Sequence, residues 1–147
     1  MKRVVTVVVA ALLCAAQPAG LMASAAEAQA GTVKVTVTYK GKGGTVDATR
    51  KLWVYLFDTP NIGPDSQPIV QMALETNGSE AVFQSVAAGI VYIAVAFDEK
   101  GAMDGQGPPP PGTPISILAD ANGAPRGLAP GDKAIATLTF DDAMRMQ

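Results

Sequence analysis

The sequence of 147 residues contains no histidine, and this absence excludes several classes of enzyme. Histidine is the usual general base near neutral pH and the commonest ligand of transition metals. Ser-His-Asp and Cys-His catalysis are therefore excluded, as are zinc hydrolase, copper and non-haem iron sites of the ordinary kind. Carboxylates, lysines, hydroxyls and the backbone remain for chemistry. A glycosidase with paired carboxylates needs a large cleft, which a domain of this size rarely builds.

Cysteine and positive charge are also scarce. The only cysteine is Cys14, near the N-terminus. Removal of residues 1–30 would leave 117 residues, enough for one domain, with no thiol for a disulfide or a metal. It would also leave 9 basic and 12 acidic side chains, because Lys2, Arg3 and Glu27 are lost from totals of 11 and 13. A net charge of −3 offers no cationic cluster, so nucleic acid is not expected as a partner.

Residues 1–30 have the pattern of a secretory signal peptide. They begin with "MKR" and continue with the apolar run "VVTVVVAALLCAA". They end with "AEAQA", in which Ala28 and Ala30 have the spacing that signal peptidase requires. We therefore expect a mature chain that begins at Gly31 and is located in the periplasm or outside the cell.

Two other interpretations of this segment agree less well with its residues. A membrane anchor needs about 20 apolar residues, whereas Gln17, Pro18 and Gly20 interrupt the run well before that length. A lipoprotein would be modified at Cys14, but Leu13 is bulkier than the small residue that a lipoprotein peptidase prefers before its cysteine. We expect no membrane span after cleavage.

The chain after Gly31 consists of short strand patterns separated by turn residues. "TVKVTVTYK" alternates between apolar and polar residues, which is typical of a strand with one buried face. "KLWVYLFD" is apolar on both faces, as a central strand is. With no convincing amphipathic helix, we predict one domain, residues 31–147, folded as an all-β, antiparallel two-sheet sandwich of about seven strands. The predicted strands are 32–40, 51–58, 69–75, 80–86, 90–97, 114–120 and 134–142.

Three local features complete the predicted fold. "TNGS" at 76–79 contains Asn-Gly, a strong hairpin signal because both residues tolerate positive φ. Gly89 is expected to adopt positive φ in a second hairpin, between the strands on either side of it. The tail at 143–147 is expected to be frayed.

The order "GTVKVTVTY…LWVYLFDTPN…VFQSVAAGIVYIAVAFDEKG" resembles the secreted bacterial transthyretin-like (prealbumin-like) sandwiches related to carboxypeptidase regulatory domains. Their hairpin pattern, "F-x-x-V-P-P-G-x-Y" followed by an alanine-rich strand and an aspartate, is matched by Phe83, Val86, Gly89, Tyr92 and Asp98. Two alanines replace the prolines. The hydroxyisourate hydrolases and intradiol dioxygenases on such sandwiches use histidines, which this chain lacks. The resemblance therefore implies a noncatalytic module, on a fold that hosts unrelated activities.

The loop "FDEKGAMDGQGPPPPG", residues 97–112, has two features of interest. Related domains often read "D-x-N-x-N-G" here, an arrangement of oxygens that suits calcium. In this chain Lys100 and Ala102 replace two of the oxygen ligands, and only Asp98, Glu99 and Asp104 could contribute side-chain oxygens. We therefore expect a connection, with these three carboxylates as the candidate ligands should calcium bind.

The four prolines of this loop favour polyproline II, which aromatic grooves recognise, although a stiff connection is the simpler interpretation. An exposed rigid loop is still a natural place for a partner. We expect a noncatalytic binding or structural module of the cell envelope, without a cofactor, acting on an unidentified envelope protein or polymer. The alternatives are a small-ligand carrier with a pocket between the sheets, an accessory subunit that docks through a sheet edge, and, less favoured, an enzyme of unusual histidine-free chemistry.

Overall fold

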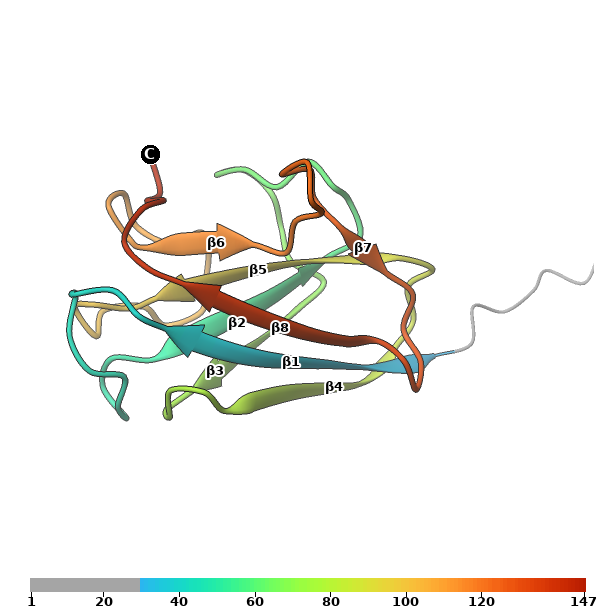
Figure 1. The fold of residues 1–147 in the computed structure, drawn as a ribbon, viewed down its shortest axis with the longest axis horizontal. Coiled ribbons are helices and arrows are strands. Elements are labelled where there is room, and N and C mark those ends of the chain that lie inside the picture. Colours follow the sequence, from blue (N-terminus) through green and yellow to red (C-terminus); the bar gives the residue numbers. More distant parts are fainter. Residues whose placement is uncertain (1–29) are drawn as a thin grey trace, which may run out of the picture.

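The computed structural model describes residues 30–147, and these residues form an all-β sandwich (Figure 1). The expected signal peptide, apart from Ala30, and its Cys14 lie outside the described residues. Within this part of the chain no helix is long and apolar enough to cross a membrane. The eight strands are β1 (Gly31–Tyr39), β2 (Leu52–Phe57), β3 (Val70–Leu74), β4 (Glu80–Val86), β5 (Val91–Phe97), β6 (Ile115–Ile117), β7 (Gly127–Leu128) and β8 (Ile135–Phe140).

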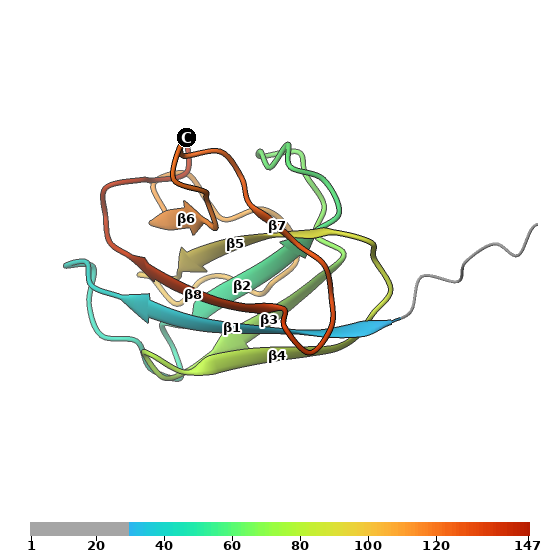
Figure 2. The same ribbon diagram turned by 45° about the vertical axis from the view of Figure 1, so that its right-hand side comes forward.

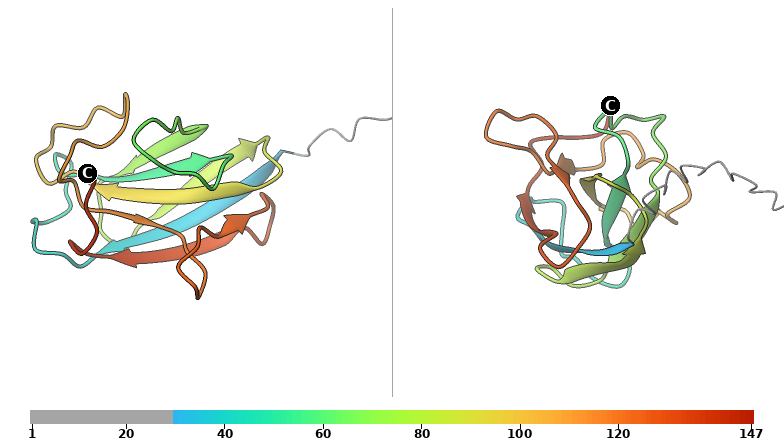
Figure 3. Two further views of the ribbon diagram at one scale, coloured as in Figure 1. Left: turned by 90° about the horizontal axis from the view of Figure 1, so that it is seen from above. Right: turned by 90° about the vertical axis from the view of Figure 1, so that its right-hand side faces the viewer.

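The strands form two sheets that face each other as two layers (Figures 2 and 3). The three-stranded sheet has the order β4-β1-β8, and the five-stranded sheet has the order β3-β2-β5-β6, with the short β7 also paired to β5. The predicted sandwich is confirmed. The sequence did not predict β7, because two residues inside a Gly- and Pro-rich loop carry no readable alternation.

One strand pair departs from the predicted antiparallel arrangement. Strand β8 runs parallel to β1, from Lys34 beside Ile135 to Tyr39 beside Phe140 (Figure 1). Parallel neighbours need a long crossover connection, whereas a hairpin forces antiparallel pairing. Strands β1 and β8 come from opposite ends of the domain, so no hairpin fixes their relative direction.

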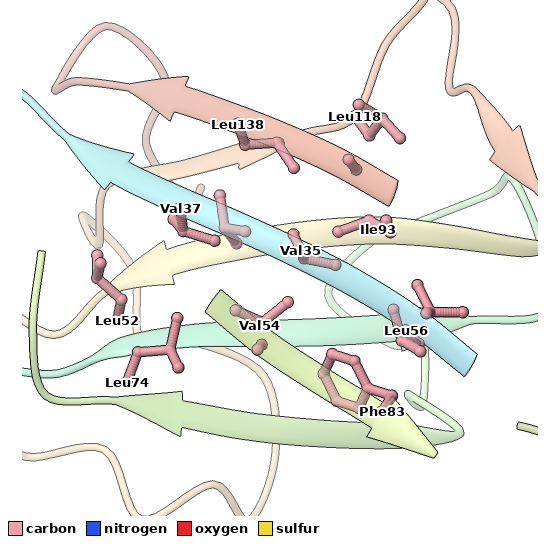
Figure 4. Close-up of a cluster of buried hydrophobic side chains, with 14 of the residues drawn as sticks. Val35, Val37, Leu52, Val54, Leu56, Leu74, Phe83, Ile93, Leu118 and Leu138 are labelled. Carbon is pink, nitrogen blue, oxygen red and sulfur yellow. The ribbon is translucent and has the colours of Figure 1, made fainter. Parts of the chain in front are cut away.

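The inner faces of the two sheets fill the space between them with apolar side chains (Figure 4). The alternation predicted for the first strand is confirmed, since Val33, Val35 and Val37 are fully buried. From the opposite sheet, Leu52 and Leu56 are also fully buried. Burying a side chain of this kind contributes about 1.5–3 kcal/mol, so this continuous core stabilises the described domain without any disulfide.

The two connections predicted as hairpins cross from one sheet to the other. The turn at 76–79 forms, with Gly78 at a φ of 78°, but it joins β3 of the five-stranded sheet to β4 of the three-stranded sheet. Asn77 fixes this crossing, because its side chain accepts from the backbone N–H of Tyr39 and donates to the Tyr39 carbonyl, both at 2.8 Å. The prediction of a paired hairpin is therefore wrong. The burial of each strand's apolar face, and not the turn between the two strands, decides which sheet that strand joins.

The predicted positive φ at Gly89 is also wrong, and Ser85 has the unusual backbone instead, with a φ of 55°. Val33 pairs with Phe83 and Gly31 with Val86, so β4 has one more residue than β1 between these two pairs. This is a β-bulge, which reverses the inward and outward alternation beyond it. The bulge allows Phe83 and Val86, three residues apart, both to face the core, at 2% and 5% exposure.

The C-terminal tail is ordered against the chain that leads into β6, so the prediction of a frayed end is wrong. The Met146 amide donates to the Thr113 carbonyl at 2.9 Å, and the Gly112 amide donates to the Met146 carbonyl at 2.8 Å. The Ile115 amide donates to the Met144 carbonyl at 3.0 Å. The tail therefore pairs like one more short strand. No local sequence pattern predicts the backbone hydrogen bonds that hold it.

A candidate binding cavity on the five-stranded sheet

The outer faces of the two sheets have different chemical character. On the three-stranded sheet most outward residues are polar, and half of them are threonine; Lys34 and Thr137, for example, are exposed to solvent. On the five-stranded sheet β2 is apolar on both faces, as the sequence predicted. Its outward residues Tyr55 and Phe57 are only 3% and 6% exposed, because loops cover this face.

Three aromatic side chains form a row along the outer face of β2. The ring centroids of Trp53 and Tyr55 are 6.4 Å apart, and those of Tyr55 and Phe57 are also 6.4 Å apart. Together with Ala96 of β5, Tyr55 and Phe57 form a second buried cluster, separate from the core between the sheets. The domain therefore has a second apolar layer outside its main core.

Two alanines of β5 leave space beside this row. Ala94 pairs with Tyr55 and Ala96 pairs with Trp53 across the ladder, so both alanines share the outer face with the aromatic rings. A cavity of about 180 Å³ lies above them. Its lining is almost wholly apolar and contains no charged side chain: Tyr55, Phe57, Ile62, Gly63, Ser66, Pro68, Ala94, Val95, Ala96, Gly107, Pro108, Pro109, Ile115, Ser116, Ile117, Met144 and Met146.

The loop between β2 and β3 forms one wall of the cavity. Ser66 braces this loop, because its hydroxyl donates to the Asn61 carbonyl and accepts from the Gly63 amide, both at 2.9 Å. This internal bonding occupies the one hydroxyl that the wall contributes. Ile62 and Pro68 supply the apolar part of the wall.

The proline-rich loop forms the opposite wall. Gln71 of β3 donates a hydrogen bond to the Gly105 carbonyl and so ties this loop to the sheet. Gly105 has a φ of 78°, and a Cβ there would lie 2.6 Å from Cζ3 of Trp53, so only glycine fits over the indole ring. Pro108 and Pro109 then reach the cavity.

The C-terminal tail forms a third wall, in which Met144 is half exposed. Met144 and Met146 line the cavity, while Arg145 between them pairs with other groups. The Arg145 guanidinium donates to the Glu99 carboxylate at 2.9 and 3.1 Å and lies 3.3 Å from Asp142. Asp142 also accepts from the buried Tyr39 hydroxyl. Burial together with this hydrogen bond raises the pKa of Tyr39 to about 12.

Two buried polar atoms in the aromatic row have no hydrogen-bond partner among the described residues: the hydroxyl of Tyr55 and Nε1 of Trp53. Buried polar groups are nearly always paired, so two exceptions in one cluster are unusual. Burial, with a smaller contribution from the charge of Asp98, raises the pKa of Tyr55 well above its usual range. The Tyr55 hydroxyl therefore stays protonated and remains a donor.

The candidate calcium ligands Asp98, Glu99 and Asp104 have separate partners. The Asp98 carboxylate accepts from the amides of Ala102 and Met103 at 3.0 and 2.8 Å and is 4% exposed. Glu99 pairs with the tail arginine, and Asp104 accepts from the amide two residues later at 2.8 Å. In the chain from residue 30 onward, no group of three or more Asp, Glu, His or Cys side chains is placed to hold a metal ion.

The remaining residues that match the family pattern lie in the core, in a connection or on the outer face of the sheet. Phe83 and Val86 lie in the core, Gly89 lies in the connection before β5, and Tyr92 is half-buried on the outer face. The most exposed of them, Gly89, borders a different hollow, whose rim holds the exposed side chains Ile69 and Ile90, at 44% and 46% exposure. The cavity over β2 and β5 has the more apolar lining of the two, so it is the stronger candidate.

Sequence reasoning missed this cavity. The sequence did contain a signal for it. One apolar strand has aromatic residues at alternate positions (Trp53, Tyr55, Phe57), and a later apolar strand has alanines at 94 and 96. The walls come from two loops and the C-terminal tail, which are far apart in the sequence, so no local pattern predicts that they meet. Comparison with protein-family models, with curated proteins and with solved structures finds no match for this chain.

Proposed function

We propose that this domain is a noncatalytic binding module of the cell envelope that holds a small, mainly apolar molecule in the cavity over β2 and β5. The observation that carries the proposal is a partly covered apolar cavity on a sheet face that is normally either solvated or fully packed. The signal-peptide pattern of residues 1–30 supports the location, and the absence of histidine supports a role without catalysis.

The size of the cavity limits the ligand. A volume of about 180 Å³ is close to the ~150 Å³ of an engineered apolar cavity that binds benzene, and below the ~300 Å³ at which drug-sized pockets begin. One ring or a short branched chain would fill it. The position also differs from the pocket between the sheets that the sequence suggested, because apolar side chains already fill that space.

Titration with cyclohexanone, followed by two-dimensional amide NMR, tests this proposal. The chain has one tryptophan, so Trp53 gives a single indole N–H signal beside the cavity. We expect saturable shifts of this signal and of the amides around Ala94. Ala94→Leu should abolish them, because a leucine there would occupy the cavity.

Ala73→Leu is the matched control, because Ala73 pairs with Trp53 on the same outer face but does not line the cavity. It should leave the titration unchanged. If the ligand-induced shifts persist in Ala94→Leu, or if no saturable shift occurs in the wild type, the cavity is not the binding site and the proposal fails.

A further inference from the structure

We infer that the molecule bound in this cavity is neutral and carries a hydrogen-bond acceptor, such as a carbonyl oxygen, which receives a bond from the hydroxyl of Tyr55. This inference rests on the proposed function and names the chemical class of its ligand. It also gives Tyr55 a role in recognition beyond that of packing.

The first argument is the unpaired state of the hydroxyl. Tyr55 lines the cavity, is 3% exposed, and its Oη has no partner among the described residues. A buried polar group without a partner is destabilising, whereas the same ring without the hydroxyl would not be. Phe57, in the next outward position of β2, shows that an unsubstituted ring fits this row. In the ligand-free domain, phenylalanine at this position would therefore be more stabilising than tyrosine.

The second argument concerns which ligands the walls accept. No charged side chain lines the cavity, and the Ser66 hydroxyl is already bonded within its own loop. An ionised ligand would find no counter-charge there, and burying an unpaired charge is strongly unfavourable. Ser116 also lines the cavity, but it pairs with Val95, whose side chain lies in the core between the sheets, so the Ser116 hydroxyl is on the other face of the sheet. Tyr55 is therefore the side chain that remains for a polar atom of the ligand, and as a protonated phenol it offers a donor.

Access to the hydroxyl depends on the proline-rich loop. The Oη atom is shielded from solvent in the ligand-free domain, and the loop lies over the same aromatic row. Gly105 and Gly107, with φ values of 78° and 130°, stand before the stiff proline segment, and Gly112 follows it at 85°. Glycine tolerates a wide range of backbone angles, so these positions are where the loop would bend, and ligand recognition by Tyr55 requires the proline segment between them to shift. A ligand acceptor would reach Tyr55 when this segment shifts.

The test is a double comparison of two probes and two proteins. Cyclohexanone and methylenecyclohexane have the same shape, but only the ketone accepts a hydrogen bond. Their Kd values are measured by NMR for the wild type and for Tyr55→Phe, which removes only the hydroxyl. We expect the preference for the ketone over the alkene to fall by about fivefold to tenfold in Tyr55→Phe, the range for one net hydrogen bond. Comparing ratios cancels the different hydration of the two probes.

The outcomes separate this inference from the proposed function. If both probes bind at the Trp53 and Ala94 signals but the preference is the same in both proteins, Tyr55 does not recognise the acceptor and the inference is overturned, while the cavity stands. If neither probe binds the wild type, the proposed function fails as well. A rise in the melting temperature of ligand-free Tyr55→Phe would support the unpaired state of the hydroxyl, and a fall would contradict it.

Discussion

Ser85 shows how a single residue redirects the chain between the two sheets. Its left-handed backbone, with a φ of 55°, forms the bulge in β4 that brings Val86 back to the core. A residue with a Cβ in this region is disfavoured by roughly 1–2 kcal/mol, and glycine is not. The strain is therefore located at Ser85, and Gly89, which the sequence pointed to, is free of it.

We predict that Ser85→Gly raises the free energy of unfolding by up to about 1 kcal/mol, the relief of strain less the added chain entropy of glycine. Gly89→Ala should be neutral or raise it by about 0.4–1 kcal/mol, because no heavy atom lies within 4 Å of an added Cβ and its φ is not in the left-handed region. Urea denaturation measures both variants. A loss of stability in Gly89→Ala larger than any change in Ser85→Gly would contradict this assignment of the strain.

At the scale of elements, the C-terminal tail is held in place by Arg145 as well as by backbone bonds. The arginine bridges Glu99, at the start of the proline-rich loop, and Asp142, at the end of β8. Its side chain is 37% exposed and that of Glu99 is 21% exposed, so water screens the pair only in part. The bridge therefore joins two of the three walls of the cavity.

We predict that Arg145→Gln increases the hydrogen-exchange rate of the Met146 and Gly112 amides, because both are bonded within the tail pairing. The loss in global stability should be small, because solvent screens a partly exposed ion pair. Amides in the core strand β5 should exchange as in the wild type. Arg126→Gln, in the loop before β7, is the control and should change neither set. Unchanged exchange at Met146 in Arg145→Gln would show that the backbone bonds alone hold the tail.

At the scale of the whole molecule, the question is whether an ion contributes to folding. The loop at 97–112 has carboxylates with calcium-like spacing, yet Asp98 already accepts two amides, and Glu99 is paired with Arg145. Binding calcium would require these contacts to be exchanged for the ion. A ligand that binds only the folded state stabilises it according to its concentration relative to Kd.

We predict that thermal melts in calcium and in chelator superimpose. At a concentration 100 times its Kd, calcium would add about 2.7 kcal/mol, a shift of several degrees in a domain of this size. Differential scanning calorimetry would detect such a shift. A melting temperature that rises with calcium in the wild type, and no longer rises in Asp98→Asn, would identify a working site with Asp98 as a ligand and would contradict this prediction.

The sequence by itself determined the strands and the class of fold. Apolar alternation in residues 33–37 and continuous apolar runs at 52–57 and 91–97 specify buried strands, because burial of side chains follows from their spacing along an extended backbone. At most strand boundaries, the turn residues predicted the end of the strand to within one or two residues of its position in the structure. Local rules were sufficient for these features because each depends on residues that are neighbours in the chain.

Only the tertiary structure decided how the strands pair and where the cavity lies. The parallel pairing of β1 with β8, the crossings at 76–79 and 87–90, and the ordered tail all depend on contacts between distant segments. The cavity exists because Ala94 and Ala96 lie beside Tyr55 and Trp53, under walls from two separate loops and the C-terminal tail. Such an arrangement arises from the summed burial of many residues, and no single stretch of the sequence contains that information.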